Sequence, residues 1–270
     1  MKKNRDREKA VFANINLQGP CNYKCFFCLG NDINCNSNYL KVHFSKWKNF
    51  NEYLEKCKKN KIKKIYLTGQ NTDPLLYKYL SELIKYLKEE GFIVGIRTNG
   101  VKALERQKEI ESCNGGVSYS IHSLDSKTNY LITKSKQVLD IKNIDKKIEK
   151  DYRVAIVINR YNKDEILDMI KELSKLKKLR YIQLRWVSTD NRYYDLKEDI
   201  KAFDELSKYI ENNYECIDEF YKAKIYDIFG IRTSLWKTVK TSINSFNYFT
   251  EGIISENYFV VEGYLQGREK

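Results

Sequence analysis

The sequence has little proline and no long apolar run. Its 270 residues include two prolines, which argues against a proline-rich linker between domains. No apolar stretch reaches the roughly 20 residues of a membrane-spanning helix, and Val11–Leu17 is too short for the core of a signal peptide. We therefore expect a cytoplasmic protein that is not bound to a membrane. In that compartment the seven cysteines are expected to be thiols or metal ligands rather than disulfides.

Acidic residues are outnumbered by basic ones. Lys and Arg total 49 and Asp and Glu total 36, which gives a formal net charge of +13. Such a charge can indicate nucleic-acid binding. The excess is mostly lysine, however, and it is scattered through every predicted helix, whereas phosphate readers more often cluster arginine. The pattern therefore favours a solvated basic surface over a nucleic-acid partner.

Strand-like and helix-like patterns alternate over the first 213 residues. Strands are predicted at Val11–Leu17, Ile62–Thr68, Phe92–Arg97, Gly116–Ile121, Tyr152–Asn159 and Leu179–Val187. Helices are predicted after them, at 45–60, 74–90, 101–111, 138–150, 163–176 and 196–212. Successive β-then-α units predict an α/β fold with parallel strands, a partial (β/α)6 barrel of the TIM type. A flavodoxin-like open sheet is the alternative, and in both folds the chemistry is expected after the carboxyl ends of the strands.

The pattern changes after Tyr214. Helical spacing fades, aromatic residues become dense, and Tyr258–Leu265 has the pattern of a strand. We therefore expect a barrel over residues 11–213 and an aromatic-rich C-terminal appendage over residues 214–270 that packs on it.

Three cysteines follow the first predicted strand with the spacing C-x3-C-x2-C, at Cys21, Cys25 and Cys28. A loop at this place can fold three thiolates around one centre, and thiolates suit Fe–S clusters and zinc. Three ligands on a four-iron cluster leave one iron open to an exchangeable ligand, as catalysis requires. The alternative is a zinc-bearing, basic nucleic-acid-binding protein with Cys35 or His43 as a fourth ligand. Zinc sites usually pair C-x2-C units, and the sequence has no second pair.

This array, with Phe27 directly before the third cysteine, resembles the cluster signature of the radical S-adenosylmethionine (radical SAM) superfamily. The resemblance extends by element order over roughly Phe12 to Val187. It implies a 4Fe-4S cluster on the three cysteines, with S-adenosylmethionine (SAM) as the second cofactor. Reductive cleavage of SAM would give a 5′-deoxyadenosyl radical that abstracts hydrogen from a small-molecule or peptide substrate. An external electron donor such as flavodoxin or ferredoxin is implied as well, and a radical SAM enzyme that modifies RNA remains an alternative.

The resemblance assigns the ammonium group of SAM to the turn after the second strand, Thr68-Gly69-Gln70-Asn71. The family often has Gly-Gly-Glu before proline at this place. Here the second glycine is absent, and two residues stand before Asp73-Pro74, so which backbone group receives the ammonium is open. On the residues alone, Asp73 predicts a helix cap.

The ends of the later strands receive the other parts of SAM by the same resemblance. Thr98 and Asn99 match the family's ribose-contacting strand end, and Ser120 matches a position that contacts ribose or carboxylate. Alternation also places Ser118, Ser120 and His122 on one face of their strand. The remaining assignments are Asn159 or Arg160 to the carboxylate, Leu184 to Val187 to the neighbourhood of adenine, and Arg185 to the substrate.

Cys35 is a further candidate catalytic residue. It lies seven residues after Cys28, in the Asn-rich loop Gly30–Asn38. A thiol near the mouth of the barrel could return a hydrogen atom to a substrate radical. The alternative is a loop cysteine without a role.

Overall fold

The computed structural model describes residues 12–33, 37–188, 196–220, 223–237, 245–257 and 260–268. The strands in this part of the chain are Phe12–Leu17 (β1), Lys64–Gly69 (β2), Ile93–Thr98 (β3), Val117–Ser120 (β4), Tyr152–Val157 (β5), Leu179–Arg185 (β6), Cys216–Phe220 (β7), Ala223–Ile228 (β8), Ile231–Trp236 (β9), Ser245–Phe249 (β10) and Ile253–Ser255 (β11). The α-helices are Phe50–Lys59 (α1), Leu80–Glu89 (α2), Gln107–Ser112 (α3), Ser126–Thr133 (α4), Ile141–Lys147 (α5), Ile166–Leu173 (α6), Lys197–Asn213 (α7) and Val260–Arg268 (α8). None of these helices is both long and apolar enough to cross a membrane.

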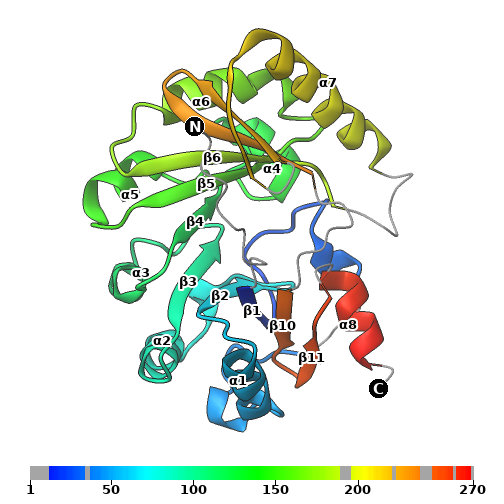
Figure 1. Ribbon diagram of the computed structural model, residues 1–270. Coiled ribbons are helices and arrows are strands. Elements are labelled where there is room, and N and C mark those ends of the chain that lie inside the picture. The colour runs from blue at the N-terminus through cyan, green and yellow to red at the C-terminus, as the bar shows by residue number, and fades with distance from the viewer. Residues whose placement is uncertain are drawn as a thin grey trace, which may run out of the picture.

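The described strands form one curved sheet in the order β11-β10-β1-β2-β3-β4-β5-β6-β9-β8-β7. From β10 to β9 all neighbours are parallel, whereas β11, β8 and β7 pair antiparallel at the two edges. Helices α1, α2, α3 and α5 cover the outer, convex face (Figure 1). The predicted α/β class and partial barrel are therefore confirmed.

Alternation along β1 separates an apolar outer face from a polar inner face. Ala13, Ile15 and Leu17 are fully buried in the core that the strands share with the helices. Asn14 and Asn16 point to the opposite face, because successive side chains of a strand alternate. Both donate from Nδ2 to Oδ1 of Asn247 on β10, over 2.9 and 3.3 Å. The interior of the barrel is therefore polar at this strand.

Several predicted helices begin later than expected; the helix predicted over 101–111, for example, begins as α3 only at Gln107. The segment predicted as one helix over 45–60 starts as a 3₁₀ turn at Phe44–Lys46, and α1 begins only at Phe50. Asn49 has a φ of 57°, a left-handed conformation that interrupts any continuous helix. The segment 74–90 is similarly split into a 3₁₀ turn at Pro74–Leu76 and α2.

The C-terminal residues extend the same sheet at both ends. β9 pairs with β6, and β10 pairs with β1. The strand predicted at Tyr258–Leu265 is wrong, because residues 260–268 form α8. Val261 and Tyr264, three residues apart, are both buried beside Phe249 and Ile33, as one side of a helix requires. The division of the chain at residue 214 stays a prediction.

Candidate active site

The three cysteines lie in a loop that leaves the carboxyl end of β1. The loop is fixed to the end of α4, since the amides of Lys24 and Phe26 donate to the carbonyls of Thr133 and Ile132 over 2.8 and 3.2 Å. Helix α4 was not predicted from the sequence. Its signal is Asp125, whose Oδ1 accepts from the amides of the first turn.

The thiols of Cys21, Cys25 and Cys28 lie close enough to raise one another's pKa. The pKa of the Cys21 thiol is raised to about 11, first by burial and then by the charges of Asp73 and Cys28. The pKa of Cys25 is raised further, by burial and then by its two partner thiols. The backbone amides of Tyr23 and Gly30 point to the sulfurs of Cys21 and Cys28, both over 3.4 Å.

The turn after β2 packs directly against this cysteine loop. The hydroxyl of Thr72 donates to the carbonyl of Pro20 over 2.7 Å, and the Gly19 amide donates to Oδ1 of Asn71 over 3.1 Å. A Cβ on Gly30 would lie 2.7 Å from Cβ of Asn71. A Cβ on Gly69 would lie 1.6 Å from the Thr72 carbonyl oxygen, so only glycine fits this tight turn.

Asp73 joins the turn after β2 to the end of β3. Its carboxylate accepts from the Leu75 amide, the Thr98 hydroxyl and the Asn99 amide, over 2.9, 2.8 and 2.6 Å. Burial raises the pKa of Asp73 to about 6, although these donors oppose the rise. Asn99 in turn donates from Nδ2 to Asn22 in the cysteine loop over 2.7 Å. The end of β3 therefore contacts both neighbouring loops.

The end of β4 reaches the cysteine loop through an aromatic contact. The ring of Phe27 meets the ring of His122 edge-on, with centroids 4.9 Å apart. His122 is buried, and its Nδ1 accepts from the Val157 amide over 3.2 Å. Burial, and then the positive charge of Arg185, lowers its pKa to about 4. Ser120 is half-buried beside Ala155 of β5.

The side chains of Asn159 and Arg160 make contacts that hold the fold together. Asn159 is fully buried, donates to the Val157 carbonyl and accepts from the Tyr161 amide, both over 3.0 Å. The guanidinium of Arg160 pairs with Asp199 of α7 at 2.7 Å and lies 5.9 Å from the ring of Phe26. Their predicted contact with the SAM carboxylate stays a prediction. Val187 is buried just beyond β6, and Cys35 lies outside the described residues.

With this geometry in place, comparison with known proteins decides the family. The model of the Radical SAM superfamily matches residues 15–171, which span the cysteine loop and β1 to β5. The chain belongs to the radical SAM superfamily. It is therefore an enzyme, and its cofactors are a 4Fe-4S cluster and SAM.

Curated radical SAM relatives differ in the activity they are named for. A protein of Methanocaldococcus jannaschii named as a glycyl-radical enzyme activating enzyme is 27% identical over 215 residues, covering 76% of this chain and 80% of the relative. An S-adenosylmethionine-dependent nucleotide dehydratase of Lacinutrix mariniflava is 29% identical over 195 residues, covering 68% of this chain and 40% of the relative.

Solved radical SAM structures share the fold. Streptococcus suis SuiB bound to its precursor peptide SuiA superposes with a TM-score of 0.62 at 14% identity, covering 90% of this chain and 59% of SuiB. Escherichia coli coproporphyrinogen III oxidase superposes with a TM-score of 0.50 at 12% identity, covering 97% of this chain and 70% of the oxidase. The chain spans about three fifths of SuiB, and at 14% and 12% identity these likenesses show the fold alone.

The residues of this radical SAM site fit both cofactors. In the described part of the chain, no three His, Cys, Asp or Glu side chains are arranged to hold a metal ion. Cys21, Cys25 and Cys28 nevertheless share one loop, and their thiolates would hold a 4Fe-4S cluster, which takes thiolate ligands. The amide of Gln70 is buried beside the loop, and neither Nε2 nor Oε1 has a hydrogen-bond partner among the described residues. Such a buried amide fits a polar ligand.

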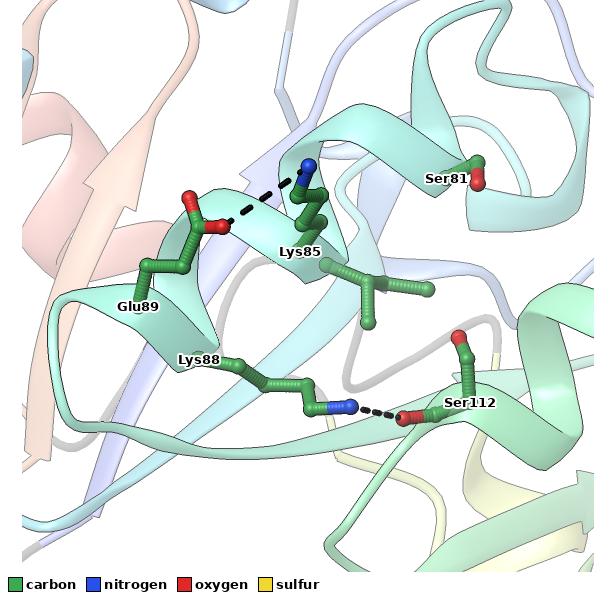
Figure 2. A pocket seen from close by; sticks show the side chains of 6 residues that line it. Ser81, Lys85, Lys88, Glu89 and Ser112 are labelled. Atoms are coloured by element: carbon green, nitrogen blue, oxygen red, sulfur yellow. Dashed lines mark hydrogen bonds and ion pairs between the residues drawn. The ribbon is translucent and has the colours of Figure 1, made fainter.

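A depression on the outer face of the barrel has no group of side chains comparable to that of the candidate active site. It lies between α2 and α3 and is lined by Ser81, Ile84, Lys85, Lys88, Glu89 and Ser112 (Figure 2). Lys85 pairs with Glu89 at 3.8 Å, and Lys88 donates to the Ser112 carbonyl over 3.0 Å. Both lysines are thus engaged locally, on the face opposite to the barrel interior.

Proposed function

We propose that this radical SAM enzyme holds its cluster on Cys21, Cys25 and Cys28, and that it acts on a small-molecule or peptide substrate inside the barrel. The observation that carries the proposal is the meeting of three thiols in a loop at the carboxyl end of β1. The same loop packs on the turn after β2 and on the end of β3.

The cysteine loop brings the three thiols together at the place where the cluster would bind. Their mutual influence on pKa reflects the cost of gathering three negative charges in a partly buried place. A bound cluster would offset this cost, because metal ions bind thiolates and displace their protons. The amides of Tyr23 and Gly30 stabilise the bound sulfurs by donating to them. When bound, the cluster and SAM together supply a 5′-deoxyadenosyl radical that takes a hydrogen atom from the substrate.

The neighbouring strand ends orient SAM. Backbone groups of Thr68 to Asn71, with the buried amide of Gln70, receive its amino-acid end. Thr98 and Asn99 are held in position by Asp73 and lie toward the ribose, together with Ser120. Phe27 of the cysteine loop packs edge-on against His122 at the end of β4. Val187 lies near the adenine.

The relatives support a substrate that is a small molecule or a peptide. SuiB is a protein that binds a precursor peptide, and the Lacinutrix relative is named for a nucleotide substrate. Reductive cleavage of SAM consumes an electron, and we infer an external donor of the flavodoxin or ferredoxin kind.

Anaerobic reconstitution tests the proposal. The wild-type protein should hold about four irons, turn brown, and release 5′-deoxyadenosine from SAM when reduced with dithionite. The triple variant Cys21→Ala/Cys25→Ala/Cys28→Ala should remain folded and lose both iron and 5′-deoxyadenosine. Cys216→Ala is the matched control, since this exposed thiol lies on β7 away from the site. Iron retained in the triple variant would overturn the assignment.

A further inference from the structure

The cysteine loop is anchored at two places, by elements that are far apart in the sequence. Its first half, with Cys21 and Cys25, is fixed to the end of α4 through the backbone amides of Lys24 and Phe26. Cys28 comes after these bonds, and its amide donates back to the Cys25 carbonyl over 3.1 Å. The chain on the other side of Cys28 has a second anchor.

Cys28 begins a short 3₁₀ turn, Leu29–Asn31, whose bonds connect its sulfur to Ile33. The Gly30 amide points to the Cys28 sulfur over 3.4 Å, and the Asn31 amide donates to the Cys28 carbonyl over 3.0 Å. The Ile33 amide then donates to the Gly30 carbonyl over 3.3 Å. The residue that directs an amide at the Cys28 sulfur is therefore bonded to Ile33.

The side chain of Ile33 is held by the C-terminal part of the chain. It is 2% exposed and belongs to an apolar cluster with Phe249 of β10 and with Val261 and Tyr264 of α8. The rings of Phe249 and Tyr264 meet with centroids 5.1 Å apart, and Leu29 packs against the same cluster. Figure 1 shows α8, in red, next to the blue segment that contains the cysteine loop. Helix α8 and the end of β10 are thus the second anchor.

Two glycines allow α8 to lie close to β11. A Cβ on Gly263 would lie 2.4 Å from Oγ of Ser255, and a Cβ on Gly267 would lie 2.3 Å from Cγ2 of Ile253. Residues four apart share one side of a helix, so a larger residue at either position would push α8 away from the strand. Such a shift would also move Tyr264 away from Ile33.

We propose that α8 positions the cluster ligand Cys28, acting through the apolar cluster that Tyr264 forms with Ile33. This inference rests on the proposed function, because it concerns the third ligand of the same iron–sulfur cluster. Ile33 cannot leave its place without exposing apolar surface to water, which costs free energy. The turn after Cys28 is therefore restrained, and the Gly30 amide stays directed at the sulfur. Hydrogen bonds to the sulfurs are one of the means by which a protein tunes such a cluster.

The reactivity of each cysteine tests this role in the full-length protein before iron is added. The protein is treated with iodoacetamide, and peptide mass spectrometry follows Cys21, Cys25 and Cys28 separately. Tyr264→Ala should raise the alkylation rate of Cys28 at least about fivefold, because a thiol reacts faster when its segment opens. The rates of Cys21 and Cys25 should change little, since α4 still holds their half of the loop.

Three further variants separate positioning from general stability. Tyr264→Phe keeps the ring and should react as the wild type does. Leu265→Ala is the matched control, because Leu265 lies on the same helix and is 41% exposed. Gly263→Val displaces α8 and removes no side chain from the apolar cluster, so it should raise the rate at Cys28 as Tyr264→Ala does.

The reconstituted holoenzyme gives a second measurement, the rate at which iron is lost to the ferrous chelator bathophenanthroline disulfonate. Tyr264→Ala and Gly263→Val should lose iron at least about fivefold faster than the wild type, whereas Tyr264→Phe and Leu265→Ala should not. Faster loss is expected because a ligand on a less restrained turn leaves the cluster more often.

Equal acceleration at all three cysteines would show that α8 only stabilises the fold. An unchanged rate at Cys28 in both Tyr264→Ala and Gly263→Val would overturn the inference. Circular dichroism identifies a variant that has lost its fold, and the other variant then carries the test. If the wild type holds iron and cleaves SAM while Cys28 reacts alike in every variant, this inference fails alone. If the wild type holds no iron, the proposed function fails, and the alkylation rates still test how α8 holds Cys28.

Discussion

The carboxylate of Asp73 accepts a hydrogen bond of 2.6 Å from the backbone amide of Asn99, and this bond ties the turn after β2 to the end of β3. The sequence predicts only a helix cap at Asp73. The structure shows this cap, in which Asp73 accepts from the Leu75 amide. It also shows that the same carboxylate binds the end of β3. Two strand ends that are proposed to hold SAM therefore share one buried carboxylate.

Replacing Asp73 should cost more than the loss of a cap. Loss of a cap alone costs about 1 kcal/mol, and unpairing Thr98 and Asn99 adds to that because hydrogen bonds to a charged group are worth more than neutral ones. We expect Asp73→Ala to lower the free energy of unfolding by roughly 3 kcal/mol. Asp140→Ala, which removes an exposed cap from α5, should cost about 1 kcal/mol. Equal losses in urea denaturation would show that Asp73 acts as a cap only.

Gly69→Ala should reshape the turn after β2. Its Cβ would lie 1.6 Å from the Thr72 carbonyl oxygen, so the backbone must move. We expect SAM affinity, measured by equilibrium dialysis, to fall at least tenfold. Gly116→Ala is the control, because a Cβ there meets nothing within 4 Å, and it should bind SAM as the wild type does. Unchanged affinity in Gly69→Ala would exclude this turn from the SAM site.

His122 should make stability depend on pH. Its pKa in the folded protein is lowered to about 4, whereas in the unfolded chain it is about 6.5. Below pH 6.5 the unfolded chain binds a proton that the folded protein refuses, so stability falls as the pH drops toward 4. Between pH 7 and 4.5 the wild type should lose about 2–3 kcal/mol more than His122→Asn, which keeps an acceptor for the Val157 amide. A wild-type profile in His122→Asn would contradict the prediction.

Arg160 gives a prediction that separates folding from cofactor binding. Asp199 is fully buried and pairs with Arg160. Arg160→Met removes the guanidinium from that carboxylate and leaves the backbone amide of residue 160 as a donor. Since Arg160 is itself partly exposed, we expect a loss of roughly 2–3 kcal/mol. Lys237→Met, which breaks an exposed pair with Asp204, should cost less than about 1 kcal/mol. Arg160→Met that has folded should keep its SAM affinity if Arg160 serves the fold, and a tenfold loss would restore its predicted role at the carboxylate.

Some of this molecule is predictable from its sequence, and the limits have physical causes. Strands β1 to β6 follow from apolar runs and the cysteine loop follows from its spacing, whereas the parallel strands β9 and β10 were not predicted. The side chain of Arg160 could not be placed, because its partner Asp199 lies on a helix 39 residues later. Helix α8 was mistaken for a strand, because a short apolar run satisfies both periods and only packing on Phe249 and Ile33 decides between them.

The pairing of β1 with β10 affects the order in which the strands of the sheet can assemble. Asn14 and Asn247 are joined by a hydrogen bond across 233 residues, and β1 has β2 on its other side. During synthesis the strand that carries the cysteine loop therefore exists long before its second neighbour. Contacts of such sequence separation form slowly. The strand that carries the cysteine loop is therefore paired on both sides only after β10 has been synthesised. A ribosome-bound chain that ends before residue 245 would present the three cysteines on a strand that still has an open edge.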